Sequence, residues 1–93
     1  MNLNTTLSQL VATRQVSDRM AEDWSFAKHV TKALGRFIGN DWGDLCDEDK
    51  QQNDEALKTE MRILASYGTG NDNIWIIKDA YDGPVTVLYP SEY

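Results

Sequence analysis

Residues 40–49 read Asn-Asp-Trp-Gly-Asp-Leu-Cys-Asp-Glu-Asp, and this stretch separates two parts of the chain that follow different patterns. Asp and Gly residues are typical of tight turns, so we do not expect a helix to continue through residues 41–44. Before the turn, apolar residues recur at helical spacing. After it, beyond one acidic helix, they recur with the period of two that is typical of strands. Helices followed by strands predict an α+β fold, with N-terminal helices packed on a C-terminal three-stranded antiparallel meander.

The chain has 93 residues, which predicts a single domain. Its parts are a helical segment over 1–39, the turn over 40–46, an acidic helix over 47–60 and strands over 62–89. One cysteine excludes an intramolecular disulfide framework, so a reducing cytoplasm is the expected location. We find no signal peptide and no apolar run near the ~20 residues of a spanning helix, so no membrane partner is expected.

The helical part contains two amphipathic stretches. Residues 1–16 carry leucines at helical spacing and predict a short helix, although Leu10 to Thr13 could instead pair as a strand. Residues 17–38 predict either one kinked helix or two, because Ser17 and Asp23 can each begin one. The apolar stripe expected to pack on the sheet contains Trp24, Val30, Leu34 and Phe37.

The turn is expected to be anchored by Asp41, Trp42 and Gly43. The Trp42 ring should be buried against the core, and Asp41 or Asp44 should accept hydrogen bonds from backbone N–H groups. Cys46, which directly follows the turn, is expected to be a small packed residue.

The acidic helix is expected to start with Asp47 as its cap and to run to about Lys58. Its inward-facing residues would be Ala56, Leu57 and Met61. The following strands are predicted at 63–67, 74–77 and 85–89, and Pro90 ends the last of them because proline cannot donate to a sheet.

Charge is concentrated in one region. Residues 41–60 hold eight acidic residues and two lysines, so their net charge of −6 equals that of the whole chain. Such a surface repels nucleic acid and anionic membranes but suits a basic protein surface. The predicted partner-binding residues are Asp44, Asp47, Glu48, Asp49, Asp54 and Glu55.

No metal or other cofactor is predicted. Asp44, Asp47 and Asp49 offer the oxygen ligands that hard cations prefer, but Gln51 and Gln52 break the EF-hand pattern. A solvated, capped helix face explains these acids without a metal.

No catalytic residue is predicted either. The chain has one histidine, His29, and no nucleotide-binding or nucleophile-elbow motif, so a small hydrolase is a weaker alternative. Lys28, Lys32 and Arg36 lie along one helix side, where they could contact phosphates in a helix-turn-helix protein. The negative charge of the domain favours a solvated face instead.

Six segments of the chain together resemble a family of small bacterial proteins. These segments read Leu-Ser-Gln-Leu-Val-Ala-Thr (7–13), Gly-Asn-Asp-Trp-Gly-Asp-Leu (39–45), Asp-Glu-Asp-Lys (47–50), Arg-Ile-Leu-Ala-Ser-Tyr (62–67), Ile-Trp-Ile-Ile (74–77) and Val-Thr-Val-Leu-Tyr-Pro-Ser-Glu-Tyr (85–93). The family occurs on plasmids, integrative elements and prophages, and its members are often labelled plasmid-related proteins. The resemblance implies a setting of mobile DNA, with no activity or catalytic residue attached to it.

The acidic surface and this setting together lead to a functional hypothesis. We expect a non-enzymatic DNA-mimic inhibitor of a host defence system such as CRISPR or restriction, binding a basic surface of a nuclease or surveillance-complex subunit as a monomer or weak homodimer. The alternative is an accessory or regulatory protein of the mobile element that acts through protein contacts, such as a dimer formed across an exposed sheet edge.

Overall fold

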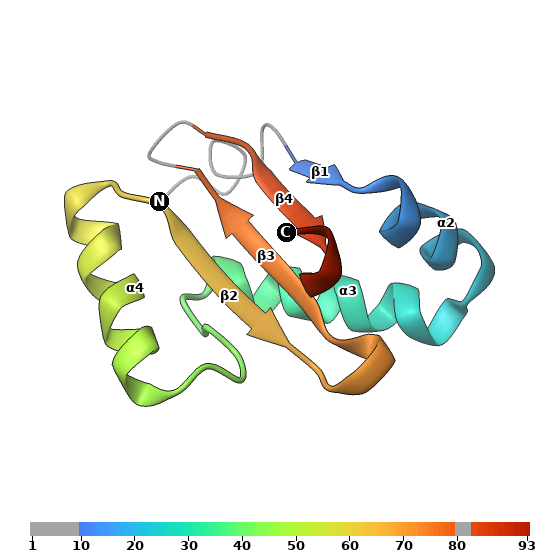
Figure 1. Ribbon diagram of the computed structural model, residues 1–93, viewed down its shortest axis with the longest axis horizontal. Coiled ribbons are helices and arrows are strands. Elements are labelled where there is room, and N and C mark those ends of the chain that lie inside the picture. Colours follow the sequence, from blue (N-terminus) through green and yellow to red (C-terminus); the bar gives the residue numbers. More distant parts are fainter. Residues whose placement is uncertain (1–9, 80–82) are drawn as a thin grey trace.

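The computed structural model describes residues 10–79 and 83–93 (Figure 1). Within them the strands are β1 (Leu10–Ala12), β2 (Ile63–Tyr67), β3 (Ile74–Lys78) and β4 (Val85–Leu88). The helices are α2 (Arg14–Glu22), α3 (Trp24–Ile38) and α4 (Asp47–Thr59), with short 3₁₀ turns η1 (Gly70–Asp72) and η2 (Pro90–Glu92). The predicted α+β class is confirmed.

The sheet differs from the prediction. It has four strands in the order β1-β4-β3-β2, and β1 runs parallel to β4 while the other neighbours are antiparallel. The three predicted strands do pair antiparallel as β2, β3 and β4, but the expectation of a three-stranded sheet is wrong. The helix over residues 1–16 is also wrong where it includes β1, and the alternative of a strand there is confirmed. Residues 1–9 lie outside the described part. β1 extends the sheet because it supplies hydrogen bonds to the free side of β4, one of which runs from Thr13 N to Val87 O at 3.0 Å.

Two separate helices follow β1, and each begins at a side-chain cap. Thr13 caps α2, because its Oγ1 accepts a hydrogen bond from Val16 N at 3.4 Å, so this helix starts three residues before Ser17. Asp23 caps α3, because its Oδ1 accepts from Phe26 N at 3.1 Å. The chain therefore forms two helices here rather than a single kinked one.

The core lies between α3 and one face of the sheet. Its residues from α3 are Phe26, Val30, Ala33 and Phe37, which face Ile63, Ala65, Tyr67, Ile74, Ile76, Val85 and Val87 from the strands, and α2 and α4 each add one residue, Val16 and Ala56. Trp24 was expected in this stripe but is 77% exposed. The reason is helical phase: Trp24 precedes Phe26 by two residues, which places it about 200° around the helix axis.

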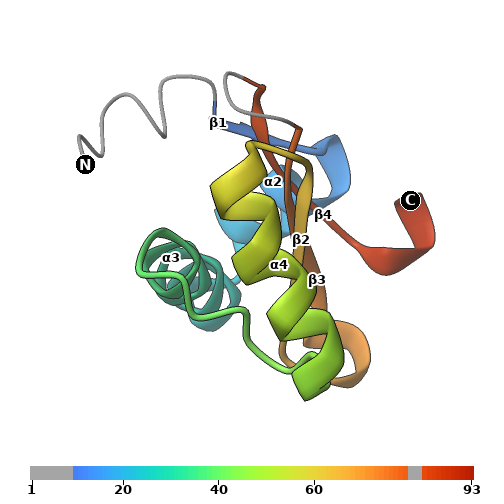
Figure 2. The same ribbon diagram turned by 90° about the vertical axis from the view of Figure 1, so that its left-hand side faces the viewer.

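The opposite face of the sheet is smaller and is closed by the end of the chain. Figure 2 shows the sheet edge-on, with α3 on one side and η2 on the other. Ile77 and Leu88 are buried on this second face. Trp75 of β3 meets the ring of Tyr93 edge-on, with centroids 5.3 Å apart. Because both faces are covered, β3 is apolar from Ile74 to Ile77.

α4 packs along the outer strand β2, and several expectations for it are wrong. Its N-cap is Cys46 rather than Asp47, and Cys46 is exposed rather than packed. Ala56 faces inward, but Leu57 and Met61 are 42% and 63% exposed. The helix buries a narrow stripe made of Asn53 and Ala56, and the chain turns away at Glu60, whose φ of 58° ends the helix.

The outer edge of β2 is filled by the turn and by α4. Asp44 N donates to Ser66 O at 2.7 Å, and Ser66 N donates to Trp42 O at 3.4 Å. Gly68 N donates to the carboxylate of Asp44 at 2.8 Å, and Asn53 Nδ2 donates to Leu64 O at 2.8 Å. The β2 backbone groups with which another chain could pair are thus already hydrogen-bonded within this protein. An edge-to-edge dimer is blocked on this side, which leaves β1 as the other outer strand.

The two tryptophans give a direct test of this packing. Trp42 is 3% exposed and meets Phe37 edge-on at 5.5 Å, whereas Trp24 is 77% exposed. We predict that Trp42→Ala lowers the free energy of unfolding by about 3–5 kcal/mol, the range for a buried aromatic. The control Trp24→Ala should change it by less than about 0.5 kcal/mol, as for an ordinary surface substitution. Urea denaturation measures both. Equal effects of the two substitutions would refute the anchoring role of Trp42.

Candidate functional site

The turn that carries the acidic region is held from three directions. Trp42 is buried, and its indole Nε1 donates to Asp54 Oδ1 of α4 at 2.9 Å. Tyr67 of β2 donates its hydroxyl hydrogen to Asp41 O at 2.7 Å. Asp41 Oδ1 accepts from Gly43 N at 3.1 Å. Asp41 and Asp44 therefore both accept backbone hydrogen bonds, as the sequence predicted.

Gly43 has to be glycine in this arrangement. Its φ is +76°, a conformation that costs other residues energy, and a Cβ here would overlap Ser66 O and press on the Tyr67 ring. The ring thus packs directly on the turn backbone. Burial raises the pKa of the Tyr67 hydroxyl, so this group stays protonated and remains a donor to Asp41 O.

An ion pair fixes the start of the turn. Arg36 Nε donates to Asp41 Oδ2 at 2.8 Å, and a second guanidinium nitrogen lies 3.3 Å from Oδ1. The Arg36 guanidinium, followed by the Gly43 N–H, holds the pKa of the Asp41 carboxyl below its usual value. Arg36 is therefore engaged with the chain itself rather than presented with Lys28 and Lys32 as a phosphate-binding side.

All six residues predicted to bind a partner are exposed. They are Asp44, Asp47, Glu48, Asp49, Asp54 and Glu55. Two of them also support the fold, because Asp44 accepts from Gly68 N and Asp54 from Trp42 Nε1. The first turn of α4 holds Asp47, Glu48 and Asp49, where negative charge complements the positive end of the helix dipole.

The spacing of α4 aligns these acids in pairs. Asp47 and Asp54 are seven residues apart, as are Glu48 and Glu55, so each pair lies on one helix side about 10.5 Å apart along the axis. Phosphates of one DNA strand recur about every 3.4 Å along the duplex axis, so the separation equals roughly three phosphate steps. Lys58 pairs with Glu55 at 3.7 Å, but both side chains are more than 70% exposed and the contact is weak.

The structure also shows a pocket that the sequence analysis did not find. It has a volume of about 190 Å³ and lies between α4 and β2, lined by Leu45, Asp49, Gln52, Asn53 and Leu64. The i, i+3, i+4 spacing of the three α4 residues could have indicated a shared helix side. Nothing in the sequence indicated that Leu45 and Leu64 would complete it.

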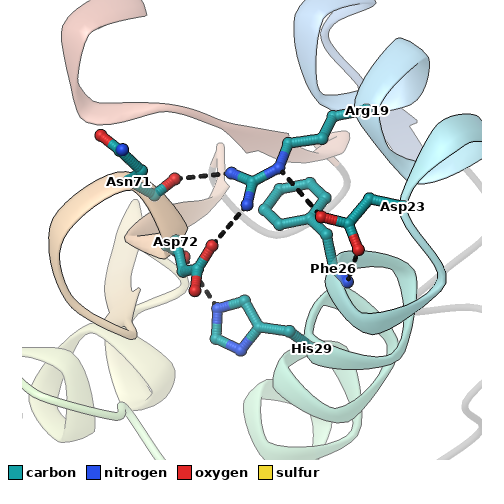
Figure 3. Close-up of polar contacts among 6 residues, drawn as sticks. All are labelled: Arg19, Asp23, Phe26, His29, Asn71 and Asp72. Atoms are coloured by element: carbon teal, nitrogen blue, oxygen red, sulfur yellow. Dashed lines mark hydrogen bonds and ion pairs between the residues drawn. The ribbon is translucent and has the colours of Figure 1, made fainter.

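A second polar cluster joins the helices to the connection between β2 and β3 (Figure 3). The guanidinium of Arg19 lies 4.0 Å over the Phe26 ring and donates to Asn71 O and to Asp72 Oδ1. Its Nε lies 3.6 Å from the carboxylate of Asp23. Nothing in the sequence indicated a role for Arg19. The cluster brings together residues that are more than fifty positions apart and fastens η1 to α2 and α3.

His29 belongs to the same cluster. Its Nε2 lies 2.9 Å from Asp72 O (Figure 3). Because a carbonyl oxygen only accepts, Nε2 carries a hydrogen and has no lone pair there for general-base chemistry. The ring also packs against Gly68, where a Cβ would come within 2.8 Å of Nε2. This contact is that of a structural histidine.

Other classes of site have little support in the part of the chain that the structure describes. Over residues 10–79 and 83–93, no group of three or more His, Cys, Asp or Glu side chains is arranged to hold a metal ion. No helix in these ranges is long and apolar enough to cross a membrane. The acidic face of α4 and its adjoining pocket are therefore the candidate site.

Comparisons with known proteins do not assign the chain to a family. No protein-family model and no solved structure matches it. In an alignment over 46 residues, the chain is 39% identical to the macrophage receptor MARCO of Mus musculus. The alignment covers 43% of this chain and 9% of the receptor, so the chain spans a small part of the receptor's length. The resemblance to proteins of mobile elements stays an interpretation of the sequence.

The Asp41–Arg36 pair predicts how stability depends on pH. The pKa of Asp41 is lower in the folded protein than its ordinary value of 3.8. Its contribution to stability is therefore present above that value and is lost as pH falls through the lower, folded-state pKa. We predict that Asp41→Asn destabilises the fold at pH 7 by up to about 1 kcal/mol, as for a half-exposed pair. The difference from wild type should shrink as the pH falls below 3.8.

Urea denaturation at pH 7 and at a pH below 3.8 measures this effect. The control is Asp18→Asn, which breaks the more exposed Asp18–Arg14 pair, 3.8 Å apart, and should have little effect at either pH. A penalty for Asp41→Asn that stays the same at low pH would show that the charge of Asp41 contributes nothing.

Proposed function

We propose that this protein is a non-enzymatic binding protein of a mobile genetic element that inhibits a host defence system acting on nucleic acid. Its acidic face would occupy the basic, nucleic-acid-binding groove of a CRISPR or restriction component. The resemblance to plasmid and prophage proteins supports the mobile-element setting. The charge and geometry of α4 support the mode of binding.

The observation that carries the proposal is the exposure of like charges on one rigid helix. Asp47, Glu48 and Asp49 are exposed, and no ion pair in the described residues neutralises them. Carboxylates displayed in this way can replace phosphates opposite Lys and Arg, which gives fast, steered association that weakens with salt. The hydrogen bonds from Asn53 to β2 and from Trp42 to Asp54 hold the helix in place, so its backbone loses little conformational freedom on binding.

The alternative is an accessory or regulatory protein of the element that acts through protein contacts. A dimer across a sheet edge would have to use β1, since β2 is occupied by the turn and α4. β1 spans three residues, Leu10–Ala12, which offers few backbone groups for pairing. The acidic-face proposal is therefore favoured.

The test is capture of a partner from a bacterial lysate on the immobilised protein, followed by salt titration of the purified complex. We predict that the captured partner is a nuclease or a surveillance-complex subunit. Its affinity for this protein should fall steadily as the salt concentration rises. Changing Asp47, Glu48 and Asp49 together to Asn, Gln and Asn should weaken binding about tenfold, on the scale of three exposed ion pairs.

A matched control removes three negative charges elsewhere. Asp18→Asn, Glu22→Gln and Asp79→Asn change residues that are exposed but lie outside the turn and α4, and this variant should bind nearly as the wild type does. An affinity that changes neither with salt concentration nor with the triple substitution in α4 would refute the DNA-mimic proposal. Capture of a partner that is not a nucleic-acid-targeting protein would favour the accessory alternative.

A further inference from the structure

The pocket beside the acidic face has features that the charge of α4 alone does not explain. Asp49, Gln52 and Asn53 form one wall, from a single side of α4. Leu45, two residues before the start of α4, and Leu64 of β2 form the apolar remainder. A pocket of about 190 Å³ is smaller than the roughly 300–1,000 Å³ typical of sites for drug-sized ligands, and it fits one long side chain.

The shape of this pocket is fixed by the fold. Asn53 is 7% exposed, and its Nδ2 donates to Leu64 O at 2.8 Å, which ties the two walls together. Leu64 alternates with Ile63 and Ala65, which belong to the main core, so its side chain is left free to line the pocket. The cavity therefore exists before any partner binds.

The electrostatics of the pocket select a cation. Asp49 is exposed at the pocket, and no ion pair engages it within the residues that the structure describes. An apolar ligand would cover the Asp49 carboxylate without pairing it, which costs free energy.

We propose that this pocket binds one arginine side chain of a basic partner protein. The arginine stem would lie against Leu45 and Leu64, and its guanidinium would donate to the Asp49 carboxylate and the Gln52 amide oxygen. Arginine suits such a site better than lysine, because it combines an apolar stem with a weakly hydrated planar fork that pairs with a carboxylate through two hydrogen bonds. The inference rests on the proposed function, since it names the contact by which the partner's basic surface would be fixed.

A titration with N-acetyl-arginine amide tests the site directly, with backbone amide signals followed by NMR. The largest shifts should fall on Asp49, Gln52, Asn53 and Leu64. N-acetyl-citrulline amide, which has nearly the same shape without the charge, should give no shifts there, and the lysine derivative should bind more weakly. Asp49→Asn should weaken binding of the arginine derivative about two- to fivefold, as for one exposed ion pair. The control Asp47→Asn removes the same charge two residues earlier on α4, at a residue that does not line the pocket, and should leave binding nearly unchanged.

The result that would overturn the inference is equal weakening by the two variants, shifts spread over all the acids, or equal binding of the citrulline or lysine derivative. The first two results, or equal binding of the lysine derivative, would indicate general electrostatic attraction rather than an arginine pocket. Equal binding of the uncharged citrulline derivative would show that the charge of the ligand plays no part. With the captured partner, the two proposals separate cleanly. If Asp47→Asn and Asp49→Asn weaken the complex equally while salt still weakens it, the pocket is wrong and the acidic-face function stands. If the arginine derivative binds as predicted but no basic partner is captured, the function is wrong and the pocket stands.

Discussion

The contact on which the rest of this structure depends is the pairing of the 41–46 turn with the outer edge of β2. The turn supplies Asp44 N and Trp42 O to the two backbone groups of Ser66, and the Asp44 carboxylate to Gly68 N. Without these bonds, β2 would present an open row of donors and acceptors. The turn thereby ends the sheet on this side and fixes where the chain leaves α3 and enters α4.

Burial of Trp42 makes this pairing stable. The ring is enclosed between Phe37 of α3 and the sheet, and its Nε1 reaches Asp54 of α4. Tyr67 contributes from the sheet by packing its ring on Gly43 and donating to Asp41 O. Trp42 and Tyr67 together thus connect α3, the turn, β2 and α4, so the acidic helix is a rigid part of the fold. A rigid display of charge loses less entropy on binding than the same residues in a flexible segment would.

The sequence predicted those parts of the fold that depend on local chemistry. The strands of the second half, the start of α3 at Asp23 and the burial of Trp42 follow from apolar period, capping and turn residues. The errors arose where tertiary contacts decided the outcome. Leu10–Ala12 carry a helix-compatible pattern, but pairing with β4 makes them a strand. Leu57 looked like an inward-facing residue, yet α4 contacts the fold through a stripe too narrow to include it.

The candidate site was predictable in composition but not in shape. Charge counting identified the exposed acids of α4, because side-chain type is enough to mark a solvated negative surface. It could not identify the pocket, whose lining comes from both α4 and β2 and depends on the hydrogen bond from Asn53 to Leu64. It also missed the role of Arg19, whose partners Asn71 and Asp72 are distant in the chain.

The claim that the turn closes the edge of β2 is tested most directly by native-state amide hydrogen exchange of Asp44, Ser66 and Gly68. If their N–H groups are bonded as described, the three amides should be protected to an extent comparable with amides of the interior strand β3, such as that of Ile76. Exchange of all three as fast as that of an exposed, unbonded loop amide would contradict the account, because the edge would then be open.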